Sequence, residues 1–312
     1  MIRRMLCALA SAGVAACVAV SPGHAGTIDL TTPEGKLQAL VKMRASADGK
    51  DTFADWQVTA WAVVSGSRPQ ALFRLDGFNV GRMERQSDGG YRFLSREVAY
   101  YRDLATGQIL ERWNNPFTKE VNDVLQVIND PVNVNFDSPT KPNGRRPPID
   151  VRGDEVVLKL DVPLAYPNPI KPQDYPLEST GEMYLASEHF IYLAKLADVS
   201  DDAVVSAPTQ YAWTRIGPWL PWMKMGKTPG WIVYVGNGRK LGGAATLDPV
   251  VRAYTLKNHP TFMKSPDAYS PTNETSWSYY RKQRPPVPPA AMTTPTSPAS
   301  AASAAAATPT SN

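Results

Sequence analysis

From Gly49 onward, one segment of this chain after another alternates apolar with polar residues. A period of two places apolar side chains on one face of an extended strand, so each segment predicts a strand with one buried face. Long helical patterns do not separate these segments, which argues against a parallel sheet built from βαβ units. The predicted strands cover residues 56–64, 71–80, 91–103, 109–113, 121–136, 155–162, 180–196, 203–215 and 231–241.

Turn signals between the segments indicate antiparallel hairpins. They lie at residues 87–90, 103–107, 152–154 and 236–238, and each contains the glycine that a tight turn favours. A mostly β fold is therefore expected, an antiparallel meander that closes into a calycin- or lipocalin-like barrel, because closure removes exposed strand edges. Two flanking helices are also expected, one that starts at Thr32 and Pro33 and one that starts at Asp248 and Pro249.

The first 25 residues have the organisation of a secretory signal peptide. An arginine pair precedes an apolar run, and a group of small residues ends at Ala25. The run is too short and wrongly flanked for a membrane-spanning helix. We expect a mature chain that starts near Gly26 and is periplasmic or secreted, by a Sec or a twin-arginine signal. Cys7 and Cys17 both lie in this segment, so no disulfide or cysteine metal site is expected in the mature chain.

The rest of the chain divides into one domain and a tail. Residues 26–283 suffice for a single core, whereas residues 284–312 are rich in Pro, Ala, Ser and Thr, a composition that predicts disorder. Charges are nearly balanced, with 33 Lys and Arg against 29 Asp and Glu. This balance argues against nucleic acid or a membrane surface as the main partner. A small-molecule ligand is expected, and the oligomeric state stays open.

The stretch 213–231 concentrates tryptophan, proline and cations. It contains Trp213, Trp219 and Trp222, with Arg215 between the first two, and prolines interrupt it. The prolines exclude a buried helix, so the stretch predicts a rigid aromatic loop that covers either a ligand or the end of the protein's own core. If it covers a ligand, the three indoles contact it and Arg215 neutralises or stacks on it.

Two residues are candidates for proton transfer. His189 belongs to an aliphatic row on its predicted strand, so it would face a barrel interior as a general acid or base, or simply as a core histidine. Glu97 shares a row with Tyr91, Phe93 and Tyr101. If that row faces inward, Glu97 is a buried acid with a raised pKa; if the alternate arginine row does, the wall binds anions instead.

Polar residues at alternate positions could orient a ligand. Asn133 shares one face of its segment with other asparagines, and Asn79 and Tyr101 belong to the same class of candidates, although an amide-rich solvent face would look alike. The chain has no G-x-S-x-G motif and no closely spaced histidine pair. Serine hydrolysis, dinucleotide binding and a metal centre are therefore disfavoured, and neither a metal nor a cofactor is expected.

Several phrases resemble a known bacterial family. They include residues 77–79, 94–97, 103–116, 129–133 and, as the most specific, the tryptophan-proline phrase from Trp213 to Trp222. Over the whole mature domain the chain is similar to the family of domain of unknown function 1838. The resemblance implies an exported protein but no particular activity.

Two functions compete on these observations. In one, the barrel binds a small, largely apolar molecule of aromatic, terpenoid or polyketide type and acts as a cofactor-free lyase or isomerase through His189 or Glu97. In the other, the same cavity belongs to a non-catalytic carrier. A third hypothesis, a carbohydrate-binding module, would need exposed and coplanar tryptophans in the 213–231 stretch.

Overall fold

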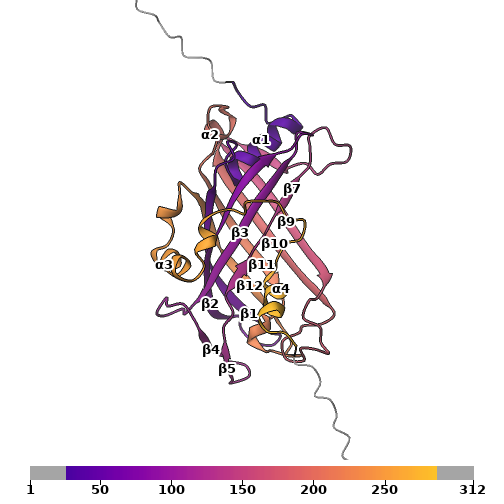
Figure 1. Cartoon of the computed structure of the whole chain (residues 1–312), viewed down its shortest axis with the longest axis vertical. Helices are drawn as coiled ribbons and strands as arrows, with labels where there is room; N and C mark the ends of the chain where they lie inside the picture. The colour runs from indigo at the N-terminus through magenta and orange to yellow at the C-terminus, as the bar shows by residue number, and fades with distance from the viewer. Residues whose placement is uncertain (1–25, 287–312) are drawn as a thin grey trace, which may run out of the picture.

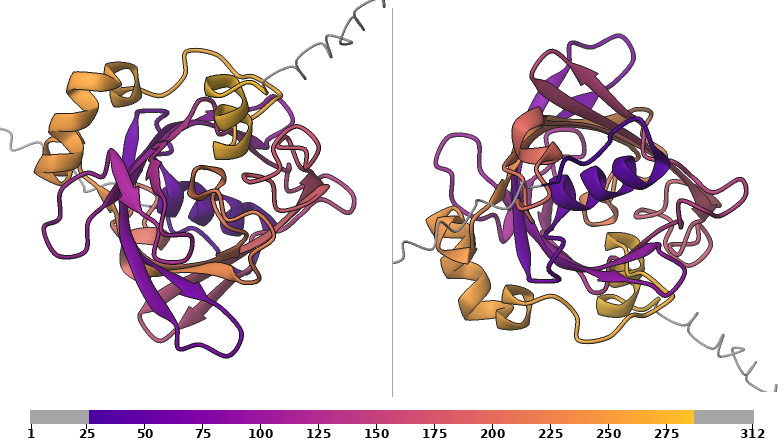
Figure 2. Two further views of the ribbon diagram at one scale, coloured as in Figure 1. Left: turned by 90° about the horizontal axis from the view of Figure 1, so that it is seen from below. Right: turned by 90° about the horizontal axis from the view of Figure 1, so that it is seen from above.

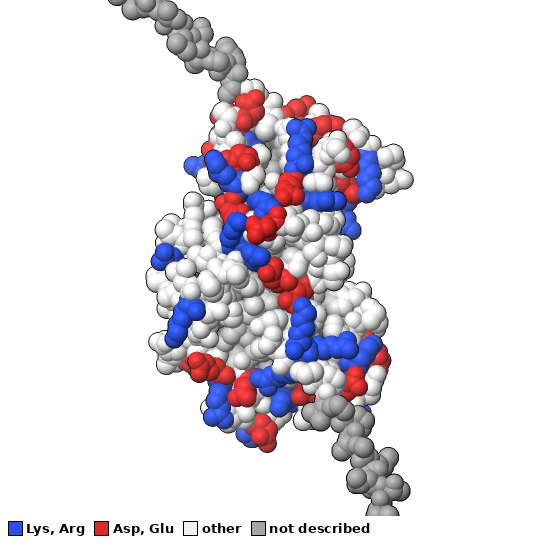
Figure 3. All heavy atoms as spheres, in the orientation of Figure 1, with Lys and Arg blue, Asp and Glu red and all other residues white. Residues whose placement is uncertain are grey.

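The computed structural model describes residues 26–286, which form a mostly β protein with a few short helices (Figure 1). The predicted signal peptide and all but three residues of the predicted tail lie outside the described residues. None of the described helices is long and apolar enough to cross a membrane. On the face drawn in Figure 3, positive and negative side chains are mixed and no large area has a single sign.

A ten-stranded antiparallel sheet forms the body of the protein. Its order is β6-β3-β2-β1-β12-β11-β10-β9-β8, and β7 pairs with β3 beside β6. The pairing of β1 with β12 joins the first long strand to the last, so the meander runs outward in both directions from that pair. The strands are β1 (Thr52–Val63), β2 (Gln70–Arg85), β3 (Tyr91–Arg102), β6 (Val127–Asn129), β7 (Val134–Phe136), β8 (Ile149–Arg152), β9 (Glu155–Pro167), β10 (Met183–Lys195), β11 (Thr209–Gly217) and β12 (Trp231–Leu241). A separate hairpin pairs β4 (Arg112–Asn114) with β5 (Val121–Asp123).

The sheet curls around a central space but does not close by strand pairing (Figure 2). Within residues 26–286, β6 and β7 at one end of the sheet are not paired with β8 or β9 at the other. The closed barrel predicted from the sequence is therefore not found. Helix α4 (Ser276–Gln283) lies in front of the sheet in Figure 1, and the segment before it contacts the β6–β7 end.

Helix α1 (Pro33–Arg44) lies across one end of the curled sheet (Figure 2). It begins as the sequence predicts, with the Thr32 side chain accepting a hydrogen bond of 3.0 Å from the Gly35 amide. At its carboxyl end the ammonium of Lys240 donates to the carbonyl oxygens of Lys42 and Ala45. Burial, with a smaller contribution from the charge of Lys42, lowers the pKa of Lys240 to about 7.

Helix α3 (Pro249–Asn258) packs on the outer face of β1, β2 and β3, where a second, smaller apolar core includes Phe78, Tyr100 and Val251. The Tyr100 hydroxyl lies 2.9 Å from the Thr255 hydroxyl. The remaining short helices are α2 (Leu196–Ser200), η1 (Pro221–Met223), η2 (Ala244–Thr246) and η3 (Pro260–Met263). The inner face of the sheet carries the main core.

Between β11 and β12, residues 218–230 of the tryptophan-rich stretch form a loop. This tryptophan-rich loop covers the protein's own core, which is the second of its two predicted roles. Trp222 lies in η1 and its ring centroid is 5.6 Å from that of Phe73, 5.0 Å from Tyr101 and 5.6 Å from Trp113. Trp219 is also buried and donates to the Thr228 carbonyl at 2.9 Å. The loop thus seals the core with indoles, which excludes an exposed carbohydrate platform built from Trp219 and Trp222.

The turn predicted at residues 236–238 is wrong, because Gly236 and Gly238 lie inside β12. A Cβ atom on Gly236 would lie 2.2 Å from the Gln57 carbonyl oxygen, and one on Gly238 would lie 2.1 Å from that of Asp55. Here glycine permits the close approach of the neighbouring strand rather than a chain reversal.

Candidate functional site

A cavity of about 710 Å³ lies inside the curled sheet. Side chains from α1, from nine strands (β1, β2, β3, β6, β7, β9, β10, β11 and β12), from the loops on either side of β7 and from residues 273–277 line it. Its exposed lining includes Arg145, Arg146, Lys159 and Asp161, which places the mouth between the two unpaired ends of the sheet. The failure of the sheet to close therefore gives the cavity its opening.

Aromatic rings form much of the cavity wall. Phe190 and Trp213, neighbours on β10 and β11, stack with centroids 6.0 Å apart and planes 12° from parallel. Tyr166 and Tyr184 stack at 4.8 Å and 28°. These pairs are flat apolar surfaces on which a planar ligand can pack.

Glu97 is the acid of the cavity. The inner row of β3 carries it, and the Asn129 amide on β6 donates to its Oε1 at 3.1 Å. Burial, together with the nearby carboxylate of Glu188, raises the pKa of Glu97 to about 7. Arg215 and the hydrogen bond from Asn129 act in the opposite direction without cancelling the effect. Glu97 can therefore both accept and release a proton near neutral pH.

Arg215 on β11 supplies a cation of the same cavity. Its Nε lies 3.4 Å from Oε1 of Glu188, and its Nη2 donates to the Tyr184 hydroxyl. The guanidinium also lies over the rings of Tyr234 and Trp277, at 5.6 Å and 5.7 Å from their centroids. Ion pair, hydroxyl and rings together fix the guanidinium in place, so it is preorganised to stabilise negative charge on a ligand.

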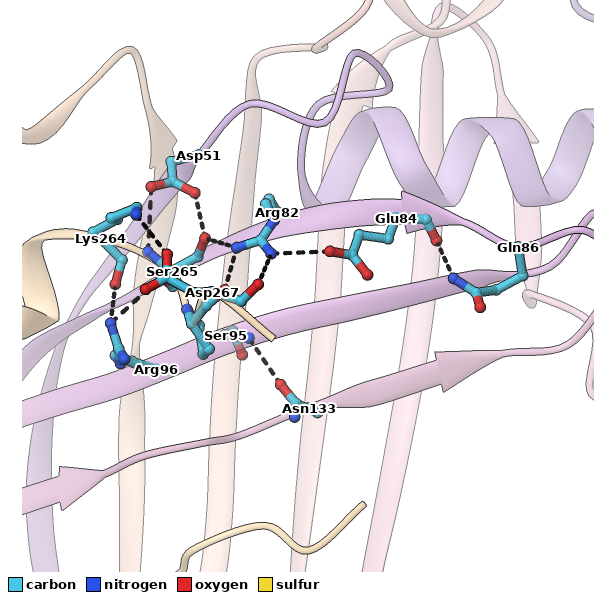
Figure 4. Close-up of polar contacts among 11 residues, drawn as sticks. Asp51, Arg82, Glu84, Gln86, Ser95, Arg96, Asn133, Lys264, Ser265 and Asp267 are labelled. Atoms are coloured by element: carbon cyan, nitrogen blue, oxygen red, sulfur yellow. Dashed lines mark hydrogen bonds and ion pairs between the residues drawn. The ribbon is translucent and has the colours of Figure 1, made fainter. Parts of the chain in front are cut away.

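A chain of hydrogen bonds holds the amide groups that lie beside Glu97, on β2 and in the loop after β6. Asn79 donates to the Ser95 hydroxyl at 3.1 Å. The Ser95 backbone amide donates to Oδ1 of Asn133 at 3.1 Å (Figure 4). Asn133 donates in turn to the Ser270 carbonyl at 3.0 Å. Asn79 and Asn133 thus line the cavity as predicted, but their amides already bind protein atoms and serve to fix this wall.

The part of the chain that forms the cavity also matches a known protein family. A family model described as "Protein of unknown function (DUF1838)" matches residues 49–284. The chain belongs to the DUF1838 family. The match spans every strand and helix that lines the cavity except α1. No curated protein matches the chain.

Five of the residues predicted for the site line the cavity of the DUF1838 domain. They are Glu97, Asn79, Asn133, Trp213 and Arg215. Tyr101, Trp219 and Trp222 do not line it, because they pack into the core at the end of the sheet closed by the tryptophan-rich loop. The aromatic row of β3 faces inward, which decides between the two alternatives left open for Glu97.

The prediction for His189 is wrong. Its side chain is 47 % exposed on the outer face of β10, where Nδ1 lies 2.7 Å from Asp161 and Nε2 lies 3.2 Å from the Ser187 hydroxyl. The hydrogen-bonded series Asp161–His189–Ser187 has the connectivity of a serine-protease triad. These side chains are open to solvent, however, and lack the enclosed oxyanion site that such chemistry requires. The aliphatic row of β10 on which the prediction was based lies on the outer face, and its Leu185 side chain is 63 % exposed.

The cavity also contains residues that the sequence interpretation missed. Glu188 lies in an aromatic row between Tyr184 and Phe190, the same pattern that singled out Glu97. Trp56 and Trp277 gave no such signal, because they come from distant parts of the chain. Within residues 26–286, no cluster of three or more His, Cys, Asp or Glu side chains could hold a metal ion.

Proposed function

We propose that the curled sheet works as a calycin-like cup for a small molecule with aromatic character, and that the protein is a cofactor-free lyase or isomerase. The observation that carries this proposal is Glu97, a carboxyl group with a pKa near 7 inside an aromatic cavity that also contains Arg215. A purely apolar cavity would favour a carrier, whereas a proton-transfer group and a preorganised cation serve chemistry.

The reaction class follows from the two groups. The Glu97 carboxylate takes a proton from a carbon next to a ligand carbonyl, and the electron pair of the C–H bond moves onto the carbonyl oxygen. Arg215, held by Glu188 and Tyr184, stabilises the resulting enolate. Protonated Glu97 then returns the proton to another carbon, which is isomerisation, or to a departing hydroxyl group, which is loss of water.

The test follows turnover in deuterated water. The protein is incubated with a small-molecule extract of its source organism, and mass spectra are recorded over time. We expect one component to decrease while an isomer labelled with deuterium, or a product lighter by one water, appears. Glu97→Gln should reduce the rate at least about 100-fold, the lower range for a general base.

His189→Gln is the matched control, because it removes the other titratable candidate from the outer face. It should leave the rate unchanged. Turnover that is as fast in Glu97→Gln as in the wild type would overturn the proposal. A component retained by the protein at unchanged mass, with no product, would indicate a carrier instead.

A further inference from the structure

The charged side chains that line the cavity leave an excess of positive charge. Each acid among them has a donor within the protein. The pairs are Glu97 with Asn129, Asp137 with Lys141, Asp161 with His189, Glu188 with Arg215, and Glu274 with Lys282. Of the lining cations, only Arg215 has a carboxylate within ion-pair distance among residues 26–286. The others are Arg44, Arg145, Arg146, Lys159 and Lys240.

Two of these unmatched cations lie inside the cavity rather than at its mouth. Arg145, Arg146 and Lys159 are exposed, so water solvates them. Arg44 and Lys240 are half-buried at the end of the sheet that α1 covers (Figure 2). A cation withdrawn from water is costly unless it is paired. A negatively charged ligand group is therefore favoured at the α1 end.

Arg44, the last residue of α1, has donors to offer such a group. The Lys240 ammonium already binds two backbone carbonyls at the end of α1. Arg44 donates from Nη1 to the Tyr192 hydroxyl. Its Nε and Nη2 have no acceptor within the described chain, and neither atom is enclosed by protein. These two N–H groups lie along one edge of the guanidinium, the geometry that receives both oxygens of a carboxylate.

The other polar end of the cavity suits an uncharged carbonyl better than a carboxylate. Arg215 is paired there with Glu188, and its Nε is enclosed by protein. Glu97 places a second acid nearby, and the charge of Glu188 helps to raise its pKa to about 7. A carboxylate would have to compete with Glu188 and would lie near Glu97, whereas a carbonyl oxygen meets no such repulsion.

Two strands set the distance between these ends. The Arg44 guanidinium lies 5.7 Å from the ring centroid of Phe93, and Glu97 follows Phe93 by four residues on the inner row of β3. It also lies 5.1 Å from the ring centroid of Tyr192, and Glu188 precedes Tyr192 by four residues on β10. Four residues of a strand span roughly 13 Å. A molecule that contacts both ends must be elongated.

Aromatic rings occupy the middle of this span. Phe190 lies between Tyr192 and Glu188 on the inner row of β10 and stacks on Trp213 of β11. A flat, apolar body can pack on this pair. The cavity of about 710 Å³ has room for several rings.

We propose that the cavity binds an elongated aromatic carboxylic acid, with its carboxylate on Nε and Nη2 of Arg44 and a carbonyl group next to Glu97 and Arg215. The carbonyl part rests on the proposed function at the same site, because the enolate chemistry requires it. The carboxylate part rests on Arg44 and on the unmatched charge of the α1 end.

The test compares two fluorescent probes of the same shape, anthracene-2-carboxylic acid and anthracene-2-carboxamide. Only the acid is an anion at neutral pH. Neither probe has a C–H bond on the carbon next to its carbonyl, so the proposed reaction cannot consume it. In fluorescence titrations of the wild-type protein, the dissociation constant of the acid should be at least about tenfold lower than that of the carboxamide, because hydrogen bonds between charged groups are the stronger ones.

Variants of α1 separate the charge of Arg44 from its packing. Arg44→Met keeps an apolar side chain and removes the guanidinium, and it should weaken the acid at least about tenfold more than the carboxamide. Arg44→Lys keeps the charge without the two-donor edge and should bind the acid with intermediate affinity. Lys36→Met removes a positive charge from α1 outside the cavity. It is the matched control and should change neither affinity.

Equal affinity of the wild type for the two probes, absence of binding by either, or an equal loss for both in Arg44→Met would overturn this assignment. A loss of acid binding in Arg145→Gln but not in Arg44→Met would place the carboxylate at the mouth and would also overturn it. The comparison in the wild type stands even if a variant fails to fold.

These outcomes are distinct from failure of the proposed function. If Glu97→Gln abolishes turnover of an extract component while Arg44→Met affects both probes equally, the enzyme proposal stands and the ligand class is wrong. If Arg44→Met selectively weakens the acid but Glu97→Gln turns over normally, the carboxylate site stands and the enzyme proposal fails.

Discussion

Glu97 connects the chemistry of the cavity to the stability of the fold. The folded protein holds the proton of Glu97 up to about pH 7, whereas a glutamate in an unfolded chain loses it near about pH 4.3. Between these values the folded state binds more protons, so this residue makes the protein less stable as the pH rises. Glu97→Gln removes that loss. Relative to wild type, the variant should gain about 2 kcal/mol between about pH 5 and about pH 8.

Urea unfolding of both proteins at the two pH values measures this gain. If the difference between variant and wild type is the same at both, the raised pKa of Glu97 is contradicted. The measurement needs no substrate, so it tests the electrostatics of the cavity apart from any activity.

At the level of single residues, the sequence shows which side chains share a row but not which row faces inward. For β3 the inward row carries Glu97, which was one of the two alternatives that the sequence left open. For β10 the aliphatic row with His189 seemed the better core, yet Tyr184 and Phe190 on the alternate row fill the interior. Both rows are apolar, so the choice depends on ring packing against other strands, which alternation cannot reveal.

The same limit holds for whole elements. The long strands and the starts of α1 and α3 were predictable, because period and capping residues are local properties of the sequence. The single strand predicted over residues 121–136 is instead three short strands, β5, β6 and β7. Closure was also mispredicted, because whether two sheet ends pair depends on curvature and on what lies between them. Here β6 and β7 are too short to offer a long edge, and the segment 273–277 contacts it instead.

The N-cap residue of helix α3, Asp248, should determine the stability of this helix without affecting the cavity. Oδ1 of Asp248 accepts from the amides of Val250 and Val251 at 3.0 Å and lies 3.3 Å from Nη1 of Arg102. Asp248→Ala removes all three contacts and should cost about 1–2 kcal/mol. Amide hydrogen exchange should show faster opening of residues 249–258.

Asp248→Asn is the matched control, because its side-chain oxygen still accepts at the cap while the charge is gone. It should lose less than half as much stability. Since α3 packs on the outer face, neither variant should change the affinity for a cavity ligand. A loss of affinity without faster exchange in α3 would show that this separation of the two faces is wrong.

At the scale of the whole molecule, residues 264–277 cross the gap that the sheet leaves beside β6 and β7. Arg82 and Arg96 on the outer face hold the chain around Ser265, with Arg82 donating to the Ser265 hydroxyl at 2.7 Å and Arg96 to the Lys264 carbonyl at 2.9 Å (Figure 4). From this anchor the chain continues along the β7 end, where Arg92 lies 4.4 Å from the ring of Tyr269. The segment therefore reaches the cavity from a fixed starting point.

Asn273 and Trp277 then connect the β6–β7 end of the sheet to β10. The Asn133 amide donates to Oδ1 of Asn273 at 2.7 Å, and Nδ2 of Asn273 donates to the Asn133 carbonyl at 2.8 Å. Four residues later, Trp277 packs on Tyr184 of β10 with centroids 4.5 Å apart. Residues 273–277 thus bridge the gap between the β6–β7 end and β10, and they form part of the cavity wall.

Loss of this bridge should release ligand without removing any charged group from the cavity. Asn273→Ala deletes both hydrogen bonds to Asn133 and should cost about 2 kcal/mol of stability, with faster amide exchange in residues 273–283. Release of a bound aromatic probe such as 1,8-dihydroxyanthraquinone, followed by stopped-flow fluorescence, should be faster by about tenfold. Asn258→Ala, which removes a hydrogen bond within α3 on the outer face, should leave release unchanged. Equal release rates in both variants and the wild type would mean that ligand leaves elsewhere and that residues 273–277 only close the fold.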